Sequence, residues 1–380
     1  MNESERLHSN ILVQLRKKLP DEDLRRLRVL AWAMTGLLLE KTIHFALWAL
    51  VIGGATLAAS RERRFRRWFN NLHVVVRGYY EPFIHEVLAD WKGQRLYLAL
   101  DTSSIDGRWT MLKVSLIYRG RAVPVAWLVL GATAHSVTLN KYRDLLRYVA
   151  TLLPANCTVV LLADRGVRDT DLMKLLREEL HWHFRIRLPK STLVNLPDGK
   201  TKALGEFRLK PGEMRFLQAV TITADAYGPV NLAFAWDPKA KDDPWYIATD
   251  EPASPTTLDE YGCRFDIEEG FLDDKSGGFQ LESTQLDTLA QLDRLLLVMA
   301  LATLHLVALG TEIVAQRLRR FVDTHWQRGL SYFQIGWRAL RQGVYRTSLP
   351  VIVAWRLSPA PDPYPVRRTS RTFTLVTDDG

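Results

Sequence analysis

The chain has 380 residues, a hydrophobic content of 47% and a formal net charge of +9 at pH 7. This length is enough for two or three domains with a sizeable core, and this composition excludes large-scale disorder. The excess of basic residues favours a polyanionic partner, because each neutralised phosphate releases condensed counterions. The two cysteines, Cys157 and Cys263, have neither the spacing of a disulfide framework nor that of a zinc site, which is typical of a reduced cytoplasmic protein.

The N-terminus and two apolar stretches bear on export and membrane insertion. The first ten residues, MNESERLHSN, are too polar and acidic for a secretory signal. The stretches 42–59 and 295–310 have the composition of membrane spans. Gly53 and Gly54 interrupt the first, and the second is shorter than the roughly 20 residues that a span needs. We expect both to be buried core helices of a protein without membrane contacts.

Residues 1–92 carry periodic leucines and tryptophans without strand alternation, which predicts a helical N-terminal region that binds DNA. Within it, the segment 61–68 (RERRFRRW) contains five arginines and two aromatic residues. On a short helix the aromatic pair would anchor the segment to the core, and the arginines could contact DNA phosphates. A solvated arginine face remains an open alternative, since basic runs are common on surfaces. The candidate DNA contacts here are Arg61, Arg63, Arg64 and Arg67.

Residues 93–190 show the change of period that marks a sheet with flanking helices. Three short apolar runs, each followed by turn residues, predict consecutive strands at 96–100, 111–118 and 122–130. A helix (137–153), a buried strand (158–163) and a second helix (170–180) are expected next. The order βββαβα predicts an α/β fold with a ribonuclease-H-like mixed sheet, whose first part these residues form.

The remaining chain divides by composition into three parts. Residues 191–244 are polar and alternating with frequent turn signals, which predicts a β-rich insertion that interrupts the sheet domain. Residues 245–310 return to a strand that opens with Trp245 and then to helices, and form the second part of that domain. Residues 311–380 are expected to be a helical C-terminal region with a basic, proline-rich tail.

Two aspartates stand where predicted strands end. Asp101 follows the first apolar run, and Asp164 follows the fourth strand. Carboxylates that converge at a sheet edge can hold two divalent ions, one for the nucleophile and one for the leaving oxygen of a phosphodiester, and magnesium is the natural choice for oxygen ligands. Each aspartate alone could equally be a turn former. Their joint placement on the first and fourth strands favours the metal site.

A third acid belongs to a patterned segment, 261–275. If this segment is one helix, four of its side chains fall within an arc of roughly 60°. These four are Tyr261, Arg264, Glu268 and Lys275. The alternative, a solvated i,i+4 pair of Arg264 with Glu268 worth about 0.3–0.5 kcal/mol, leaves the tyrosine and the lysine unexplained. Gly262 and Gly270 count against a regular helix, because each costs up to about 1 kcal/mol relative to alanine.

The spacing Y-x2-R-x3-E-x6-K resembles the signature of the bacterial insertion-sequence DDE transposases, the family that moves by cut and paste through hairpin DNA ends. The surrounding residues are similar to the family's three acid motifs. These blocks are Leu100-Asp101-Thr102-Ser103, Ala163-Asp164-Arg165-Gly166 and Ile267-Glu268-Glu269. Together they cover about residues 96–310 in the expected order, and the arginine-rich segment before them is also similar to the family's N-terminal region.

The resemblance implies a role for each matching residue. Asp101, Asp164 and Glu268 would be catalytic and would hold two Mg²⁺ ions, for which Mn²⁺ could substitute. Further residues would contact the DNA at the cleaved end: Tyr261, Arg264, Lys275, Trp245 and Arg165. The family tryptophan that Trp245 resembles stacks on a flipped base, while a buried core aromatic is the open alternative.

The expected function is metal-dependent cleavage and strand transfer at transposon DNA ends. The expected partners are double-stranded DNA, as inverted-repeat ends and as target, and a second copy of the chain in a synaptic complex. We expect the protein in the bacterial cytoplasm, associated with the nucleoid. The alternatives are a domesticated protein that binds DNA ends without cutting and a nuclease of the same fold without strand transfer. A carboxylate-pair hydrolase such as a glycosidase fits the basic charge poorly.

Overall fold

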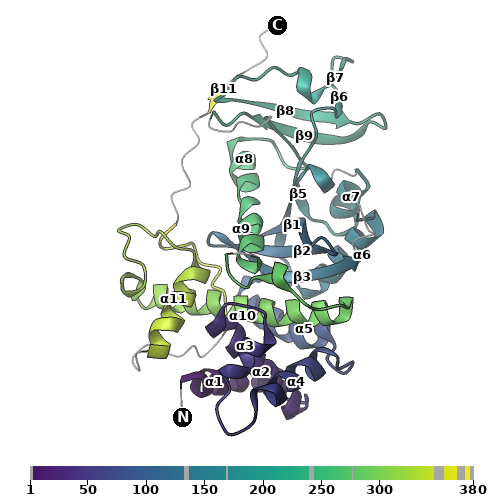
Figure 1. Ribbon diagram of the computed structural model, residues 1–380. Coiled ribbons are helices and arrows are strands. Elements are labelled where there is room, and N and C mark those ends of the chain that lie inside the picture. Colours follow the sequence, from purple (N-terminus) through teal and green to yellow (C-terminus); the bar gives the residue numbers. More distant parts are fainter. Residues whose placement is uncertain are drawn as a thin grey trace.

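The computed structural model describes residues 3–131, 137–167, 170–238, 244–275, 277–345, 355–365 and 373–376. A large mixed sheet forms its middle and upper part, the N-terminal helices lie below the sheet, α10 (Leu289–Ala315) runs across the molecule between the two, and α11 (Tyr332–Tyr345) lies to one side (Figure 1). This α/β architecture with helical N- and C-terminal regions confirms the predicted fold class.

The N-terminal helices pack around a cluster of aromatic rings. They are α1 (Glu3–Lys18), α2 (Leu24–Glu40), α3 (Phe45–Leu50), α4 (Ala58–Phe69) and α5 (Val76–Val87). Phe45 stacks on Phe69 with centroids 4.6 Å apart, and Trp48 meets Phe65 edge to face at 5.5 Å. The predicted long helix over 42–59 is wrong: α3 ends at Leu50, the chain turns at Gly54, whose φ of 96° suits glycine, and α4 begins at Ala58.

Eleven described strands belong to one sheet. They are β1 (Arg95–Ile105), β2 (Trp109–Tyr118), β3 (Arg121–Gly131), β4 (Thr158–Ala163), β5 (His183–Arg187), β6 (Leu193–Asn195), β7 (Thr201–Ala203), β8 (Glu213–Ile222), β9 (Tyr227–Ala235), β10 (Trp245–Thr249) and β11 (Thr374–Leu375). The order is β3-β2-β1-β4-β5-β10-β9-β8-β6-β7, with β11 beside β8. β1 runs parallel to β4 and antiparallel to β2, and β4 runs parallel to β5, as a ribonuclease-H-like sheet requires.

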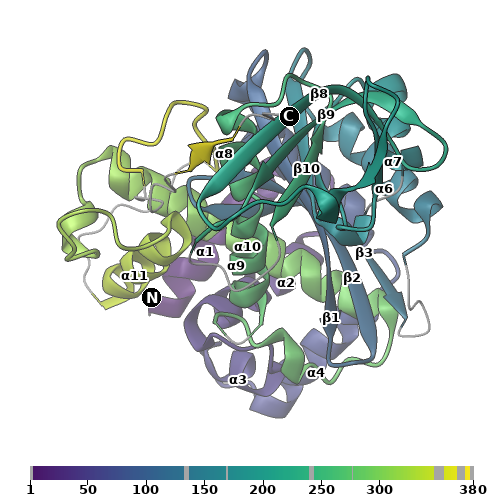
Figure 2. The same cartoon turned by 90° about the horizontal axis from the view of Figure 1, so that it is seen from above.

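The β-rich segment after β5 extends the same sheet. β10 pairs on one side with β5 and on the other with β9, so that β8 and β9 continue the sheet upward in Figure 1. Figure 2, seen from above, shows β8, β9 and β10 side by side. β5 was not predicted, and it is the strand that joins the two parts of the sheet.

Two groups of helices border the strands β1 to β5 (Figure 1). On one side lie α6 (Leu139–Leu152) and α7 (Thr170–Lys174), which continues as a π-helical turn. On the other side lie α8 (Pro255–Gly262) and α9 (Phe265–Asp274). Predicted helices at 137–153 and 170–180 therefore both exist, and the second changes its hydrogen-bond pattern midway.

The central helix of the C-terminal half is α10 (Leu289–Ala315). It is long and apolar enough to cross a membrane, yet 89% of its most apolar window is buried inside the protein, which confirms a core helix over 295–310. α11 (Tyr332–Tyr345) crosses it at two glycines. A Cβ at Gly310 would lie 2.0 Å from the carbonyl oxygen of Tyr332, so only glycine permits this approach.

Candidate active site

Asp101 and Asp164 lie next to each other in the register of parallel strands. The last paired residues of β1 and β4 are Leu100 and Ala163, and each aspartate is the next residue along its chain. Asp101 is not the end of its strand, because β1 continues to Ile105 through its antiparallel pairing with β2. The aspartate pair thus marks the point where β1 leaves β4, which explains how residues 63 positions apart in the sequence become neighbours.

The segment that carries the third acid is two helices rather than one. α8 ends at Gly262, and the amides of Cys263 and Arg264 bond to carbonyls three residues earlier, at 3.0 and 2.9 Å. These tight bonds replace the α-helical pattern before α9 begins at Phe265. The prediction of a single helix over 261–275 is therefore wrong, although Tyr261, Arg264 and Glu268 still meet in one site.

Arg264 is the centre of the site. Its side chain is 3% exposed, and its two terminal nitrogens donate to Asp101 at 3.0 Å and to Glu268 at 2.5 Å. One buried guanidinium therefore links an acid on β1 with an acid on α9. Such a charge-assisted pair orients both carboxylates.

Asp164 is attached to the same region by two other side chains. The hydroxyl of Tyr261, which is fully buried, donates to Asp164 at 3.4 Å. A guanidinium nitrogen of Arg187 on β5 lies 4.0 Å from Asp164. The three predicted acids are thus gathered around Tyr261 and Arg264.

The charges of the site act on one another. Burial raises the pKa of Asp101, and the nearby carboxylates of Asp164 and Glu268 raise it further, while Arg264 opposes them. Burial also raises the pKa of the Tyr261 hydroxyl, so this group stays protonated at neutral pH. Burial disfavours the charged form of Arg264, but its anionic neighbours outweigh that effect and raise its pKa. Arg264 thus holds two of the three acids together, and Tyr261 and Arg187 hold the third beside them.

The acids suit a divalent ion in chemistry but not in their present spacing. Carboxylate oxygens are the donors that Mg²⁺ prefers. Among the described residues, however, no three histidine, cysteine, aspartate or glutamate side chains lie close enough to hold one ion together. Arg264 instead supplies the positive charge between Asp101 and Glu268.

The structure places the other candidate contacts around this cluster. Trp245 opens β10, is half-buried, and packs against Tyr261 and Phe265 with centroids 5.2 and 5.6 Å away. Arg165 is exposed and directly follows Asp164. Lys275 directly follows α9, and its ammonium lies 3.1 Å from Glu282 rather than in the Arg264 cluster.

The predicted arginines of α4 divide into two kinds. Arg61 is 8% exposed and donates to the carbonyl oxygens of Ala49 and Gly54, so its proposed contact with DNA is corrected to a structural role. Arg63, Arg64 and Arg67 are exposed. A groove of about 410 Å³ along α4 is lined by Ser60, Arg63, Arg66, Arg67 and Asn70.

Sequence patterns missed a network that holds α8 against the sheet. The buried guanidinium of Arg185 on β5 donates to Glu260 at 2.7 Å and to Glu251 at 2.5 Å. Glu260 also accepts from Tyr97 of β1 at 2.7 Å, four residues before Asp101. Since Glu260 directly precedes Tyr261, this network sets where the acid-bearing segment meets β1. The alternating HFRIR pattern of β5 is the sequence signal that could have revealed it.

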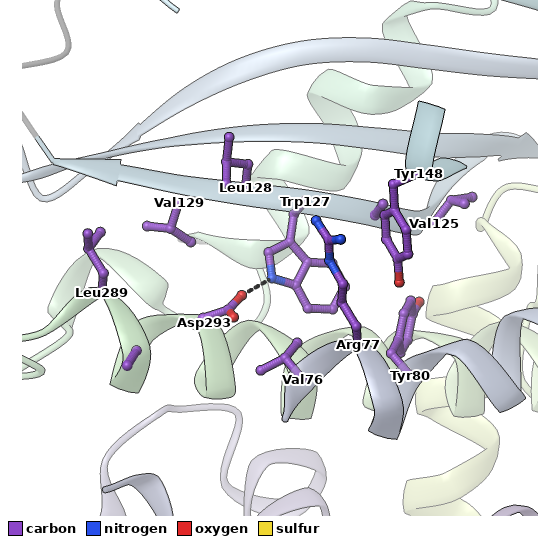
Figure 3. A pocket seen from close by; sticks show the side chains of 12 residues that line it. Val76, Arg77, Tyr80, Val125, Trp127, Leu128, Val129, Tyr148, Leu289 and Asp293 are labelled. Carbon is purple, nitrogen blue, oxygen red and sulfur yellow. Dashed lines mark hydrogen bonds between the residues drawn. The ribbon is translucent and has the colours of Figure 1, made fainter. Parts of the chain in front are cut away.

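A separate cavity of about 250 Å³ lies between β3 and the helices α5, α6 and α10 (Figure 3). Its polar groups are already paired. The indole of Trp127 donates to Asp293 at 2.7 Å, and the guanidinium of Arg77 lies 3.9 Å from the ring centroid of Tyr148. None of the three candidate acids lines this cavity, so it is not part of the site.

Comparison with known proteins shows the family to which the chain belongs. Residues 83–304, more than half of the chain, match the family model of the transposase DDE domain. The chain therefore belongs to the DDE transposase family, whose members are nucleotidyl-transferase enzymes of DNA transposition and generally depend on divalent metal. A cryo-electron microscopy structure of the piggyBac transposase synaptic complex with hairpin DNA is similar at 13% identity and a TM-score of 0.40, over 96% of this chain and 86% of that chain. No protein with a curated description matches.

Proposed function

We propose that this protein cleaves and rejoins DNA at transposon ends, with Asp101, Asp164 and Glu268 as its catalytic acids. The observation that carries the proposal is the pair of links made by Arg264, which joins Asp101 on β1 to Glu268 on α9 beside Asp164. If Arg264 and Glu268 formed only a structural ion pair on a surface helix, Arg264 would not also contact Asp101 on β1, and Asp164 would not lie beside them. The α4 groove supplies a basic surface for the DNA backbone.

The proposed chemistry has two steps. Water attacks phosphorus at the transposon end, the bond from phosphorus to the 3′ oxygen breaks, and this oxygen takes up a proton. The freed 3′ hydroxyl then attacks phosphorus of the opposite strand, forms a new ester bond, and releases the 3′ oxygen of that strand to give a hairpin. Two Mg²⁺ ions, or Mn²⁺ in their place, would supply activation of the nucleophile and stabilisation of the leaving oxygen when held by the three acids.

The chain's own residues would position the substrate. Arg264, Lys275 and the hydroxyl of Tyr261 would hold phosphates at the cleaved end, and Arg165 would contact the strand beside Asp164. Trp245 packs on Tyr261 and Phe265 and so would offer its remaining surface to a flipped base. Two ends processed together would require two copies of the chain. This part of the proposal rests on the family resemblance of these positions.

Incubation of the purified protein with duplexes that carry its element's ends and Mg²⁺, resolved on a denaturing gel, tests the proposal. We expect nicked, hairpin and joined products from the wild type. Asp164→Ala should lower cleavage by about 100-fold or more while gel-shift binding stays nearly unchanged, because metal-assisted chemistry requires this acid but backbone contacts do not. Cleavage that survives in Asp164→Ala would refute the assignment of the site.

A second candidate, a protein that binds DNA ends without cutting them, is favoured by one observation. The described acids do not form a three-ligand metal set, and Arg264 holds two of them. The same gel separates the candidates, because such a protein shifts the end duplex but yields no products with Mg²⁺ or Mn²⁺. Nicked products without joined ones would instead indicate a nuclease that lacks strand transfer.

A further inference from the structure

The segment 316–331 between α10 and α11 forms a loop that exposes two large aromatic side chains. Phe321 is 69% exposed, and Trp326 is 85% exposed, the highest value among the large hydrophobic residues that the structure describes. Single exposed hydrophobic residues are ordinary on protein surfaces. Two aromatic side chains presented on one short loop form a candidate interaction site.

Asp323 holds this loop in shape from inside. Its side chain is fully buried, and its carboxylate accepts hydrogen bonds from Arg319 at 2.9 Å and from the backbone amide of Gly329 at 3.1 Å. Arg319 also donates to the carbonyl oxygen of Trp326 at 3.0 Å. The loop is therefore ordered before any partner binds, which lowers the entropic cost of binding.

Within the loop 316–331 the exposed charges are cationic, and exposed acids lie outside it at Glu312 and at Glu40. Arg317 and Arg320 are exposed, and the guanidinium of Arg320 lies 5.3 Å from the ring centroid of Trp326. Between residues 313 and 331 the sequence contains one acid, the buried Asp323. From α11, Arg338 donates to the carbonyl oxygen of Val322 at 3.3 Å and so brings a further positive charge to the loop.

The positive region extends to the N-terminal helices through Lys41, which directly follows α2. Its ammonium lies 4.1 Å from the ring centroid of Trp337 on α11. Burial lowers the pKa of Lys41, and Arg341 and Arg338 lower it further, because like charges disfavour its protonated form. The cations and the aromatic residues together form a surface that we call the basic-aromatic surface. Its members are Lys41, Arg317, Arg320, Phe321, Trp326, Arg338 and Arg341.

We propose that the basic-aromatic surface binds double-stranded DNA outside the acid-bearing site. Its cations would neutralise backbone phosphates, and Phe321 and Trp326 would pack on the sugars or against a base step in the minor groove. A second copy of the chain is the less favourable occupant, because a twofold interface would bring the same cations face to face. The inference rests on the proposed function in one respect, that the partner is DNA.

The test measures DNA binding without catalysis. Asp164→Ala protein in EDTA is titrated with a long duplex of unrelated sequence at several salt concentrations, and binding is followed by fluorescence anisotropy. In this background the Arg317→Gln/Arg341→Gln double variant should reduce the slope of log K against log salt by about 1.8, which is about 0.9 for each phosphate that the protein no longer neutralises. Trp326→Ala should weaken binding by about fivefold or more.

Two exposed positions elsewhere serve as matched controls. Arg147→Gln removes a guanidinium whose side chain is 50% exposed on α6, and Leu72→Ala removes an apolar side chain that is 82% exposed. Neither should change the salt slope or the affinity. All variants should have the same melting temperature as the Asp164→Ala parent protein, because the substituted side chains are exposed.

An unchanged salt slope in the double variant would overturn the inference. So would a loss of self-association in Trp326→Ala, measured by sedimentation, with unchanged DNA binding, since that result would assign the surface to a second copy of the chain. If the wild type cuts no DNA ends but the slope falls as expected, the proposed function fails while the DNA-binding surface stands.

Discussion

The guanidinium of Arg264 donates to Asp101 across 3.0 Å, within a site that our proposal assigns to metal ions. A cation of the protein and a cation from solution would therefore compete for the same carboxylate. Glu268, which Arg264 also contacts at 2.5 Å, is subject to the same competition. This relationship makes Arg264 a residue whose removal should change metal binding even without DNA.

In Arg264→Gln, the acids lose their internal counter-charge and repel one another. We expect a lower melting temperature than wild type in EDTA and a gain with Mg²⁺ that exceeds the wild-type gain by about 2 °C or more, because bound ions then replace the missing charge. Thermal melts in EDTA and in MgCl₂ measure both effects. Arg147→Gln is the control, because Arg147 lies on α6 and pairs with Glu179 rather than with one of the three acids. This variant should respond to Mg²⁺ as the wild type does. An equal Mg²⁺ effect in Arg264→Gln and wild type would show that Arg264 and the ions do not compete.

Substitution of two arginines of α4, Arg61 and Arg63, should affect the free energy of unfolding to different extents. Arg61→Ala removes hydrogen bonds to the carbonyl oxygens of Ala49 and Gly54, and we expect it to lower the free energy of unfolding by about 2 kcal/mol. Arg63→Ala removes an exposed side chain of the α4 groove, and should leave stability within about 0.5 kcal/mol of wild type.

In DNA binding the order of the two effects should be the opposite, with Arg63→Ala the more harmful substitution. Arg63→Ala should reduce the salt slope of end binding by about 0.9, whereas Arg61→Ala should leave the slope unchanged at a temperature where it is folded. Urea melts and salt titrations measure the two properties separately. A reduced slope in Arg61→Ala would place this buried side chain back among the DNA contacts.

The strands and their acids could be predicted because the signals are local. The apolar runs within β1 and β4 are short, bounded, and followed directly by Asp101 and Asp164, so the sequence alone marks both acids, although β1 continues past Asp101 to Ile105. Parallel pairing then brings them together. The long apolar run of α10 was equally clear, since a helix buried on all sides needs no polar face.

The break after Gly262 and the strand β5 could not be predicted in the same way. A helical wheel treats residues 261–275 as one regular helix, but the amides of Cys263 and Arg264 bond to carbonyls three residues earlier, and α8 ends before α9 begins. The sequence does not predict β5 as a buried strand, because two of its five residues are arginines. Arg185 is buried only because Glu251 and Glu260, more than 60 positions later, supply its counter-charges.

Arg185 should therefore be a positioning residue for the acid-bearing segment. Arg185→Ala leaves Glu251 and Glu260 without their shared cation, and we expect a loss of about 3 kcal/mol or more in the free energy of unfolding. Arg185→Lys keeps the charge but cannot donate to both carboxylates and Thr249 in the same planar geometry. If the network positions Tyr261, Arg185→Lys should lower the rate of single-turnover cleavage while end binding stays unchanged. Normal cleavage by a fully folded Arg185→Lys protein would reduce the network to a structural role.

At the far end of α9, Asp273 gives the protein a pH-dependent contact. Burial raises the pKa of Asp273 from 3.8 to about 6, Arg121 at 2.9 Å opposes the rise, and the neighbouring Asp274 adds to it. Because the folded value is the higher one, the stabilising effect of the protonated form is complete below pH 3.8 and is lost as the pH rises through about 6. Ionised Asp273 then costs up to about 3 kcal/mol.

Asp273→Asn removes this titration while it keeps an oxygen that can accept from Arg121. The free energy of unfolding of the variant, minus that of the wild type, should increase between pH 4 and pH 7, by up to about 3 kcal/mol. Urea melts across this pH range measure the difference, and Asp171→Asn, an exposed acid on α7, should show no such increase because its pKa is lowered rather than raised. A difference that stays flat or falls with pH would mean that Arg121 fully compensates the burial of Asp273, and that its ionised form anchors α9 to β3.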